Sequence, residues 1–277
     1  MKPQKTPLTL IELLVVIAVV MLLPAIITAS LGTARNLAKI PLCANNLRQI
    51  GAAVYEYAQI FDGNLLNVRM PAHISPSGSD EVHPYVAYRL DHTVIPGSNQ
   101  LLPYRLACLY EAGLINDPSL FYCPANENTW FVFKSYNNPQ PWGALPQVWN
   151  TEGQMNQWVR CGYEWFPVDK NPELQPFRVW GLPHAPKRLC RKFDNLDPNL
   201  PYCSDVLRYT DRFSHSYDQV VGLNVLYSDG RVFFQDDPNI FTHRVWDLDP
   251  SGYTAREIMA IYYCRILLLA AQLGGTE

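Results

Sequence analysis

Residues 5–23, KTPLTLIELLVVIAVVMLL, form an apolar run that carries one carboxylate, Glu12, near its start. No residue between Glu12 and Arg35 is charged. As an α-helix with a rise of about 1.5 Å per residue, this segment would cover about 33 Å, and a hydrocarbon core is about 30 Å thick. Lys2 and Lys5 precede the run, so the positive-inside rule predicts a single membrane pass with the rest of the chain outside the cytoplasm.

The helical pattern continues beyond the apolar run. Apolar side chains recur at three- and four-residue steps, as on one face of an amphipathic helix, at Leu37, Ile40, Leu47, Ile50, Val54 and Tyr57. Pro24 is expected to kink this helix without ending it, whereas an interruption is expected near Pro41. Gly63 supplies a stop signal.

These patterns divide the chain into three parts. A basic, leader-like segment covers 1–7, a long helix covers 8–61, and a globular body covers 62–277. The helix has a membrane half at 8–34 and a docking half at 35–61. A cleaved secretory signal is an alternative for the first segment, although no A-x-A-like site closes the apolar run.

The composition argues against several function classes. The net charge is −3 and charged residues make up 17%, so no basic block indicates nucleic-acid binding. The sequence has no G-x-S-x-G, H-E-x-x-H, phosphate-loop or G-x-G-x-x-G motif. A Ser214–His215 pair is present, but such pairs arise by chance in a chain this long. We therefore expect no enzymatic activity.

The seven cysteines lie at 43, 108, 123, 161, 190, 203 and 264, and no two have C-x-x-C spacing. This scatter argues against a zinc module. Outside the cytoplasm some of them can pair, and the odd number leaves at least one free. The sequence leaves the connectivity open, and Cys123 is equally well read as half of a disulfide or as a small buried residue.

Two segments resemble a known family. TLIELLVVIAVV at 9–20 and ARNLAKIPLCANNLRQIGAAVYEYA at 34–58 are similar to the type IV prepilins and type II secretion pseudopilins. The likeness is greatest to the planctomycete and verrucomicrobial group with a prepilin-type cleavage and methylation N-terminus. It implies an α+β fold, in which a long N-terminal transmembrane helix packs on a C-terminal antiparallel sheet that carries a loop-rich insertion.

The resemblance also implies roles for three residues near the N-terminus. A prepilin peptidase would cut between Pro7 and Leu8, the new N-terminus would be methylated, and Glu12 would pair with the terminal amine of a neighbouring subunit. Such a pair offsets the cost of burying a carboxylate. The family has glycine where this chain has Pro7, and usually phenylalanine where it has Leu8. Proline lacks the N–H and the flexibility of glycine, so cleavage remains open.

The partners and the location follow from the same resemblance. They are copies of this chain or related pilins, the prepilin peptidase, the secretion or pilus assembly machinery, and the membrane. The location is the cytoplasmic membrane, with a single pass and the body outside, and the cell surface or periplasm after assembly. An alternative function is that of an uncleaved bitopic protein that displays a binding body, for example for carbohydrate.

That alternative would use the tryptophans. Six of the seven lie between 130 and 180, at Trp130, Trp142, Trp149, Trp158, Trp165 and Trp180. Exposed indoles could form a sugar-binding platform, whereas buried ones would fill the core of a loop-rich domain.

A hairpin is predicted from Asp229-Gly230, which lies between two apolar runs. A two-residue type I′ turn would place Tyr227 opposite Val232 and Val225 opposite Phe234, with all four on one inward face. His215, with Asp229 and Gly230, also resembles the C-terminal signature of the pilin-like family.

Calcium is an open alternative in this region, because related pseudopilins hold calcium near their C-terminal loops. Asp218 and Asp229 are the candidate ligands, and Asp205 and Asp211 lie nearby in the sequence, but the spacing matches no defined calcium loop. The other interpretation is that Asp229 serves the turn and His215 bonds to a loop, so no metal or cofactor is expected. The apolar stretch at 258–273 is predicted to be a docking helix.

Overall fold

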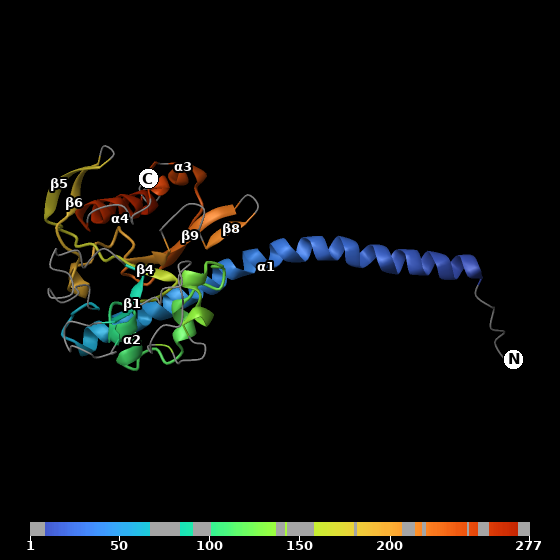
Figure 1. The fold of residues 1–277 in the computed structure, drawn as a ribbon, viewed down its shortest axis with the longest axis horizontal. Helices are drawn as coiled ribbons and strands as arrows, with labels where there is room; N and C mark the ends of the chain where they lie inside the picture. Colours follow the sequence, from blue (N-terminus) through green and yellow to red (C-terminus); the bar gives the residue numbers. More distant parts are fainter. Residues whose placement is uncertain are drawn as a thin grey trace.

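The computed structural model describes residues 9–66, 84–90, 101–136, 142, 158–179, 182–206, 214–217, 220–242, 244–248 and 255–270. These residues form helices and antiparallel sheets, so the predicted α+β class is confirmed. In Figure 1 the N-terminal part of helix α1 projects from the body as a long rod, and its C-terminal part runs along the body.

Helix α1 spans Leu10–Ile60, which is 51 residues. It ends as predicted, because Gly63 adopts a positive φ of 70° and its N–H donates to the Ala58 carbonyl at 2.7 Å. The predicted interruption near Pro41 is wrong, since the helix continues through this residue. A proline removes one N–H donor and strains one turn, at a cost of about 3 kcal/mol, and the packed helix that follows offsets this cost.

The packed face of α1 begins later than predicted. Leu47, Ile50 and Val54 are buried as expected, whereas Leu37 remains 42% exposed. Among the side chains of α1 whose burial the structure describes, the first that is fully buried is that of Cys43. Within the part of the chain that the structure describes, no helix has a segment that is both long and apolar enough to cross a membrane.

The main sheet has five antiparallel strands and packs on α1. Four strands lie in the order β10-β9-β7-β4, and β8 pairs with the first part of β9. The strands are β4 (Tyr163–Trp165), β7 (Cys203–Asp205), β8 (His215–Tyr217), β9 (Val220–Leu226) and β10 (Val232–Gln235). Because β9 is central and lies against α1, its residues Leu223 to Leu226 are buried on both faces.

Two smaller sheets complete the body. One has the order β2-β1-β3, and the other is the pair β5-β6. Their bounds are β1 (Val86–Leu90), β2 (Leu101–Pro103), β3 (Trp158–Arg160), β5 (Leu174–Val179) and β6 (Leu182–Pro186). The short helices are α2 (Ala107–Glu111), η2 (Pro118–Phe121), η3 (Thr129–Phe131), η4 (Phe133–Ser135), η5 (Phe193–Asn195), α3 (Pro238–Phe241) and η7 (Arg244–Asp247).

Helix α4 (Ala255–Ala270) lies on the β5-β6 pair, as expected for a docking helix. Most of its apolar side chains are buried, among them those of Ile261 and Ile266, whereas Leu267 is 39% exposed. Arg265 is also buried, and its Nη2 donates to the carbonyls of Val245 and Leu248, each at 2.9 Å. The charged side chain that interrupts this apolar stretch is therefore hydrogen-bonded to backbone carbonyls of the body. The predicted helix end lies outside the described residues.

The β9-β10 hairpin forms, but its predicted register is wrong by one residue. Val232 lies opposite Leu226 and Phe233 opposite Val225, so the loop has three residues, 228–230. Gly230 has a φ of 85°, whereas Asp229 is not among the residues with positive φ. This is the combination of a type I turn with a left-handed glycine. Phe233 is 38% exposed and Val232 and Phe234 are half buried, so the side of β10 that was predicted to face inward is still the more buried one.

The loop conformation predicts different effects for substitutions of Asp229 and Gly230. Replacing Gly230 with Val should destabilise the body by about 1–2 kcal/mol, because a side chain at positive φ is strained. Asp229→Asn should change stability by less than about 1 kcal/mol. The asparagine oxygen can still accept the Arg231 N–H, and only an exposed ion pair with Arg231 is lost. Thermal melts of both variants, with and without calcium, test this; a calcium-dependent loss in Asp229→Asn would contradict it.

Candidate functional site

The first candidate site is the projecting part of α1. Ten large apolar side chains between Leu10 and Met21 are exposed, with exposed fractions of 46% to 80%. They are Leu10, Ile11, Leu13, Leu14, Val15, Val16, Ile17, Val19, Val20 and Met21. An apolar surface this continuous is typical of sites that contact another protein or a membrane.

Glu12 lies in the first turn of this rod and forms a capping box with Thr9. Its Oε2 accepts from the Thr9 N–H at 2.7 Å and from the Thr9 hydroxyl at 2.8 Å, and its own N–H donates back to that hydroxyl. The sequence pattern T-x-x-E at residues 9–12 is the usual signal for such a capping box. The prediction that Glu12 acts in assembly does not depend on this signal. In the single chain Glu12 therefore has a structural role. Pro7 and Leu8 lie outside the described residues.

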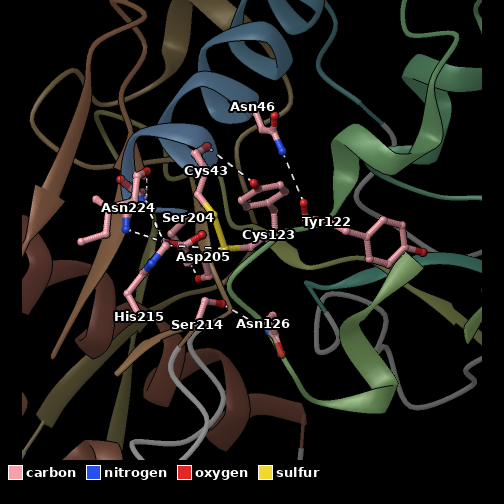
Figure 2. Close-up of polar contacts among 12 residues, drawn as sticks. Cys43, Asn46, Tyr122, Cys123, Asn126, Ser204, Asp205, Ser214, His215 and Asn224 are labelled. Carbon is pink, nitrogen blue, oxygen red and sulfur yellow. Dashed lines mark hydrogen bonds and ion pairs between the residues drawn. A yellow bond between two sulfur atoms is a disulfide. The ribbon is translucent and has the colours of Figure 1, made fainter. Parts of the chain in front are cut away.

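The second candidate site is a buried cluster between α1 and the main sheet (Figure 2). Cys43 comes from α1, Cys123 follows η2, Asp205 ends β7, His215 begins β8, and Asn224 lies in β9. The exposed fraction of each is 2% or less. Within the described residues, this is the one place where at least three Cys, His, Asp or Glu side chains converge closely enough to hold a metal ion.

A disulfide joins Cys43 to Cys123, with a Cα–Cα distance of 5.3 Å. The sequence left this pairing open. Nearby hydrogen bonds fix the same contact, since the Asn46 amide donates to the Tyr122 carbonyl at 3.3 Å. The Asn126 amide donates to the Ser214 hydroxyl at 3.2 Å, which ties the segment after η2 to the residue before His215 (Figure 2).

His215 presents Nε2 to three polar groups at once. This nitrogen lies 3.3 Å from Asp205 Oδ2, 3.1 Å from Asn224 Nδ2 and 3.5 Å from Cys123 Sγ. Asp205 Oδ2 also accepts from the backbone N–H of Asn224 at 2.7 Å and from its side-chain amide at 3.0 Å. The ring of Phe234 packs edge-on against the imidazole.

The predicted signature residues do not form one site. His215 pairs with Gly222 near the start of β9, whereas Asp229 and Gly230 follow its far end. Asp229 is in an exposed turn and pairs with Arg231 at 3.2 Å, so within the described part of the chain it belongs to no metal-ligating group. Asp218, the other weak calcium candidate, lies outside the described residues, as does Asp211.

The tryptophans that the structure describes support the core interpretation. Trp165 and Trp142 are buried, and the Trp142 N–H donates to the Tyr122 hydroxyl at 2.7 Å. Trp130 is partly buried and packs against the guanidinium of Arg160. Trp149, Trp180 and the side chain of Trp158 lie outside what the structure describes.

Five cysteines belong to no disulfide, and four of them are buried. Burial raises the pKa of the Cys161 thiol to about 12 and those of the Cys190 and Cys264 thiols to about 11. It also raises the pKa of Cys203 well above its ordinary value. Such thiols hold little reactive thiolate at neutral pH.

Alkylation should therefore proceed in steps. In the native, unreduced protein only the half-buried Cys108 should react readily. Unfolding without reduction should expose five reactive thiols, and reduction should then give seven. Counting the added mass by mass spectrometry tests the pairing, and seven reactive thiols before reduction would contradict it.

Comparison with protein-family models, with curated proteins and with solved structures finds no match for this chain.

Proposed function

We propose that this chain is a structural subunit of a filament of the type IV pilus or type II secretion pseudopilus kind. The observation that carries the proposal is the exposed apolar rod at Leu10–Met21, which carries Glu12 in its first turn. Before assembly, the rod and the residues that follow it would lie in the cytoplasmic membrane with the body outside. In the filament, the rods of neighbouring subunits would cover one another.

The apolar side chains of the rod would be kept from water both in the membrane and in the filament. Covering an apolar side chain of this size contributes about 1.5–3 kcal/mol when it is complete. Even at about 1 kcal/mol each, the ten exposed side chains would favour a covered rod over a rod in water by on the order of 10 kcal/mol. Lipid provides this cover before assembly, so packing between neighbouring rods would favour the filament over the single subunit in the membrane. The body is already folded on its own core and leaves the rod without a cover within the described residues.

Glu12 would give this association its register. In a filament interior the capping bonds from Thr9 would remain, but the carboxylate charge would be removed from water. A terminal amine from a neighbouring subunit would offset that cost only in the correct axial position, so wrong registers would be disfavoured. The capping box orients the carboxylate before the neighbour arrives.

The test separates the charge of Glu12 from its capping role. Glu12→Gln removes the charge but keeps a side chain that suits a capping box, whereas Glu12→Ala removes both. We expect both variants to fold and both to lose most filament incorporation, measured as sheared filament yield from cells. If Glu12→Gln assembles like the wild type, only the cap matters and the pairing role is wrong. If both variants assemble normally, the filament proposal loses its main support.

Pro7 favours a second candidate, an uncleaved protein anchored in the membrane by the same helix. A peptidase that recognises glycine should cut poorly after proline. The N-terminal sequence of the protein purified from its native membrane distinguishes the two. A methylated Leu8 supports the filament, and an intact Met1 supports the anchor. Trp142 and Trp165 do not support a carbohydrate platform, because both are buried.

A further inference from the structure

The buried cluster contains the ligand types of a tetrahedral zinc site. One atom each from Cys43, Cys123, Asp205 and His215 lie within 4.8 Å of one another. Thiolate sulfur, imidazole nitrogen and carboxylate oxygen are the ligands that zinc takes in proteins. We propose that the protein with both cysteines reduced binds one zinc-class divalent cation here, and that formation of the Cys43–Cys123 disulfide releases it. This proposal does not depend on the filament function.

Two separations in the cluster already fit tetrahedral coordination. Zinc bonds of about 2.0–2.1 Å to nitrogen and oxygen, and about 2.3 Å to sulfur, place neighbouring ligands about 3.3–3.6 Å apart. Nε2 of His215 lies 3.3 Å from Asp205 Oδ2 and 3.5 Å from Cys123 Sγ. After reduction the two sulfurs would separate to about 3.8 Å, and no pair of ligand atoms has to close from more than 4.8 Å.

The hydrogen-bond pattern around His215 also favours a cation. A neutral imidazole nitrogen can donate to Asp205 or accept from Asn224, but it cannot do both, although both groups lie within 3.3 Å of Nε2. A cation would instead attract the nitrogen lone pair and the carboxylate together. Asp205 is fully buried, and its Oδ1 has no hydrogen-bond partner among the described residues.

Asn224 would support the site without binding the metal. Its backbone N–H and its side-chain amide both donate to Asp205 Oδ2, so they fix the direction of the carboxylate. Partners of this kind orient the ligands of metal sites.

The chemistry of the switch balances with a dithiol as reductant. The dithiol transfers two electrons and two protons to the disulfide and becomes a disulfide itself, which leaves two cysteine thiols. Binding of the cation then displaces the two thiol protons. In the reverse direction, an external disulfide accepts two electrons from the bound thiolates, the S–S bond forms again, and the cation leaves because two of its four ligands are lost.

The test uses the full chain in detergent micelles and Co²⁺ as a spectroscopic probe. After reduction with a phosphine and removal of the excess reagent, Co²⁺ should give thiolate charge-transfer bands and the strong visible bands of tetrahedral coordination. Zinc should abolish these bands at about one equivalent per chain, and the oxidised protein should show neither effect. Reoxidation with a small-molecule disulfide should release zinc in step with loss of the two thiols.

Variants identify the ligands. Cys43→Ser, Cys123→Ser and His215→Gln should each weaken Co²⁺ binding at least tenfold, whereas Cys108→Ser, outside the cluster, should bind as the reduced wild type does. Circular dichroism without metal checks that each variant folds. The wild-type comparison needs no variant, so it remains decisive if a variant misfolds. Absence of thiolate bands in the reduced wild type, or equal binding by the oxidised protein, would overturn the proposal.

Discussion

Removing the Cys43–Cys123 disulfide should lower the free energy of unfolding of the body by about 4 kcal/mol. The two cysteines are 80 residues apart in the sequence, and the chain-entropy model assigns about 4.5 kcal/mol to a loop of this size. Loss of a native disulfide typically costs about 2–5 kcal/mol. In a chain of this length the melting temperature should fall by about 10 °C.

The measurement compares the double variant Cys43→Ala/Cys123→Ala with the oxidised wild type by thermal and urea unfolding, with a chelator present. Cys108→Ala is the matched control, because Cys108 belongs to no disulfide and is only half buried, and it should change stability by less than about 1 kcal/mol. If the double variant unfolds within about 1 kcal/mol of the wild type, the disulfide does not restrain the unfolded chain as proposed.

Gly222→Ala should destabilise the body by about 2–3 kcal/mol or prevent folding. A Cβ at this position would lie 2.4 Å from the Phe234 ring and 2.7 Å from the Gln235 carbonyl oxygen. The ring can turn aside, but the carbonyl belongs to β10, so β9 and β10 would have to separate locally. Overpacking of this kind typically costs about 1–3 kcal/mol.

The same substitution should also disturb the buried cluster. Gly222 pairs with His215 across β8 and β9, and the centroid of the Phe234 ring lies 5.6 Å from that of the His215 imidazole. Ser216→Ala is the control, since Ser216 is the exposed neighbour of His215 on β8 and should have almost no effect. The measurement is urea unfolding of both variants beside the wild type. A Gly222→Ala protein as stable as Ser216→Ala would show that β10 can move away at little cost.

Signals that act within a few residues could be read from the sequence. The long helix, its end at Gly63, the docking helix α4 and the hairpin at Asp229-Gly230 all appear in the structure. Each depends on periodicity or on the conformational freedom of one glycine, which are local properties. The continuity of α1 through Pro41 could not be read in this way, because the packing that offsets the strain comes from the body.

The hairpin shows where local information ends. The Asp-Gly pair predicts a turn, but a two-residue and a three-residue loop are both compatible with it. In the structure Gly230 alone of the pair has a positive φ, which suits a three-residue loop, and Leu226 therefore lies opposite Val232. The shift changes which residue of β9 lies opposite each residue of β10, but Val232 and Phe234 remain on the more buried face and Phe233 on the exposed one, as the alternation of the strand predicts.

The sequence by itself determined the elements of this protein: an apolar N-terminal helix with Glu12 near its start, an amphipathic continuation, a β-hairpin and a final docking helix. Only the tertiary structure decided that Cys43, Cys123, Asp205 and His215 meet. These residues come from α1, from the segment after η2, and from β7 and β8. Cys43 and Cys123 are 80 residues apart, Cys123 and Asp205 are 82 apart, and Asp205 and His215 are 10 apart. Their contact depends on how α1 packs across the sheet, and no pattern over a few neighbouring residues encodes that packing.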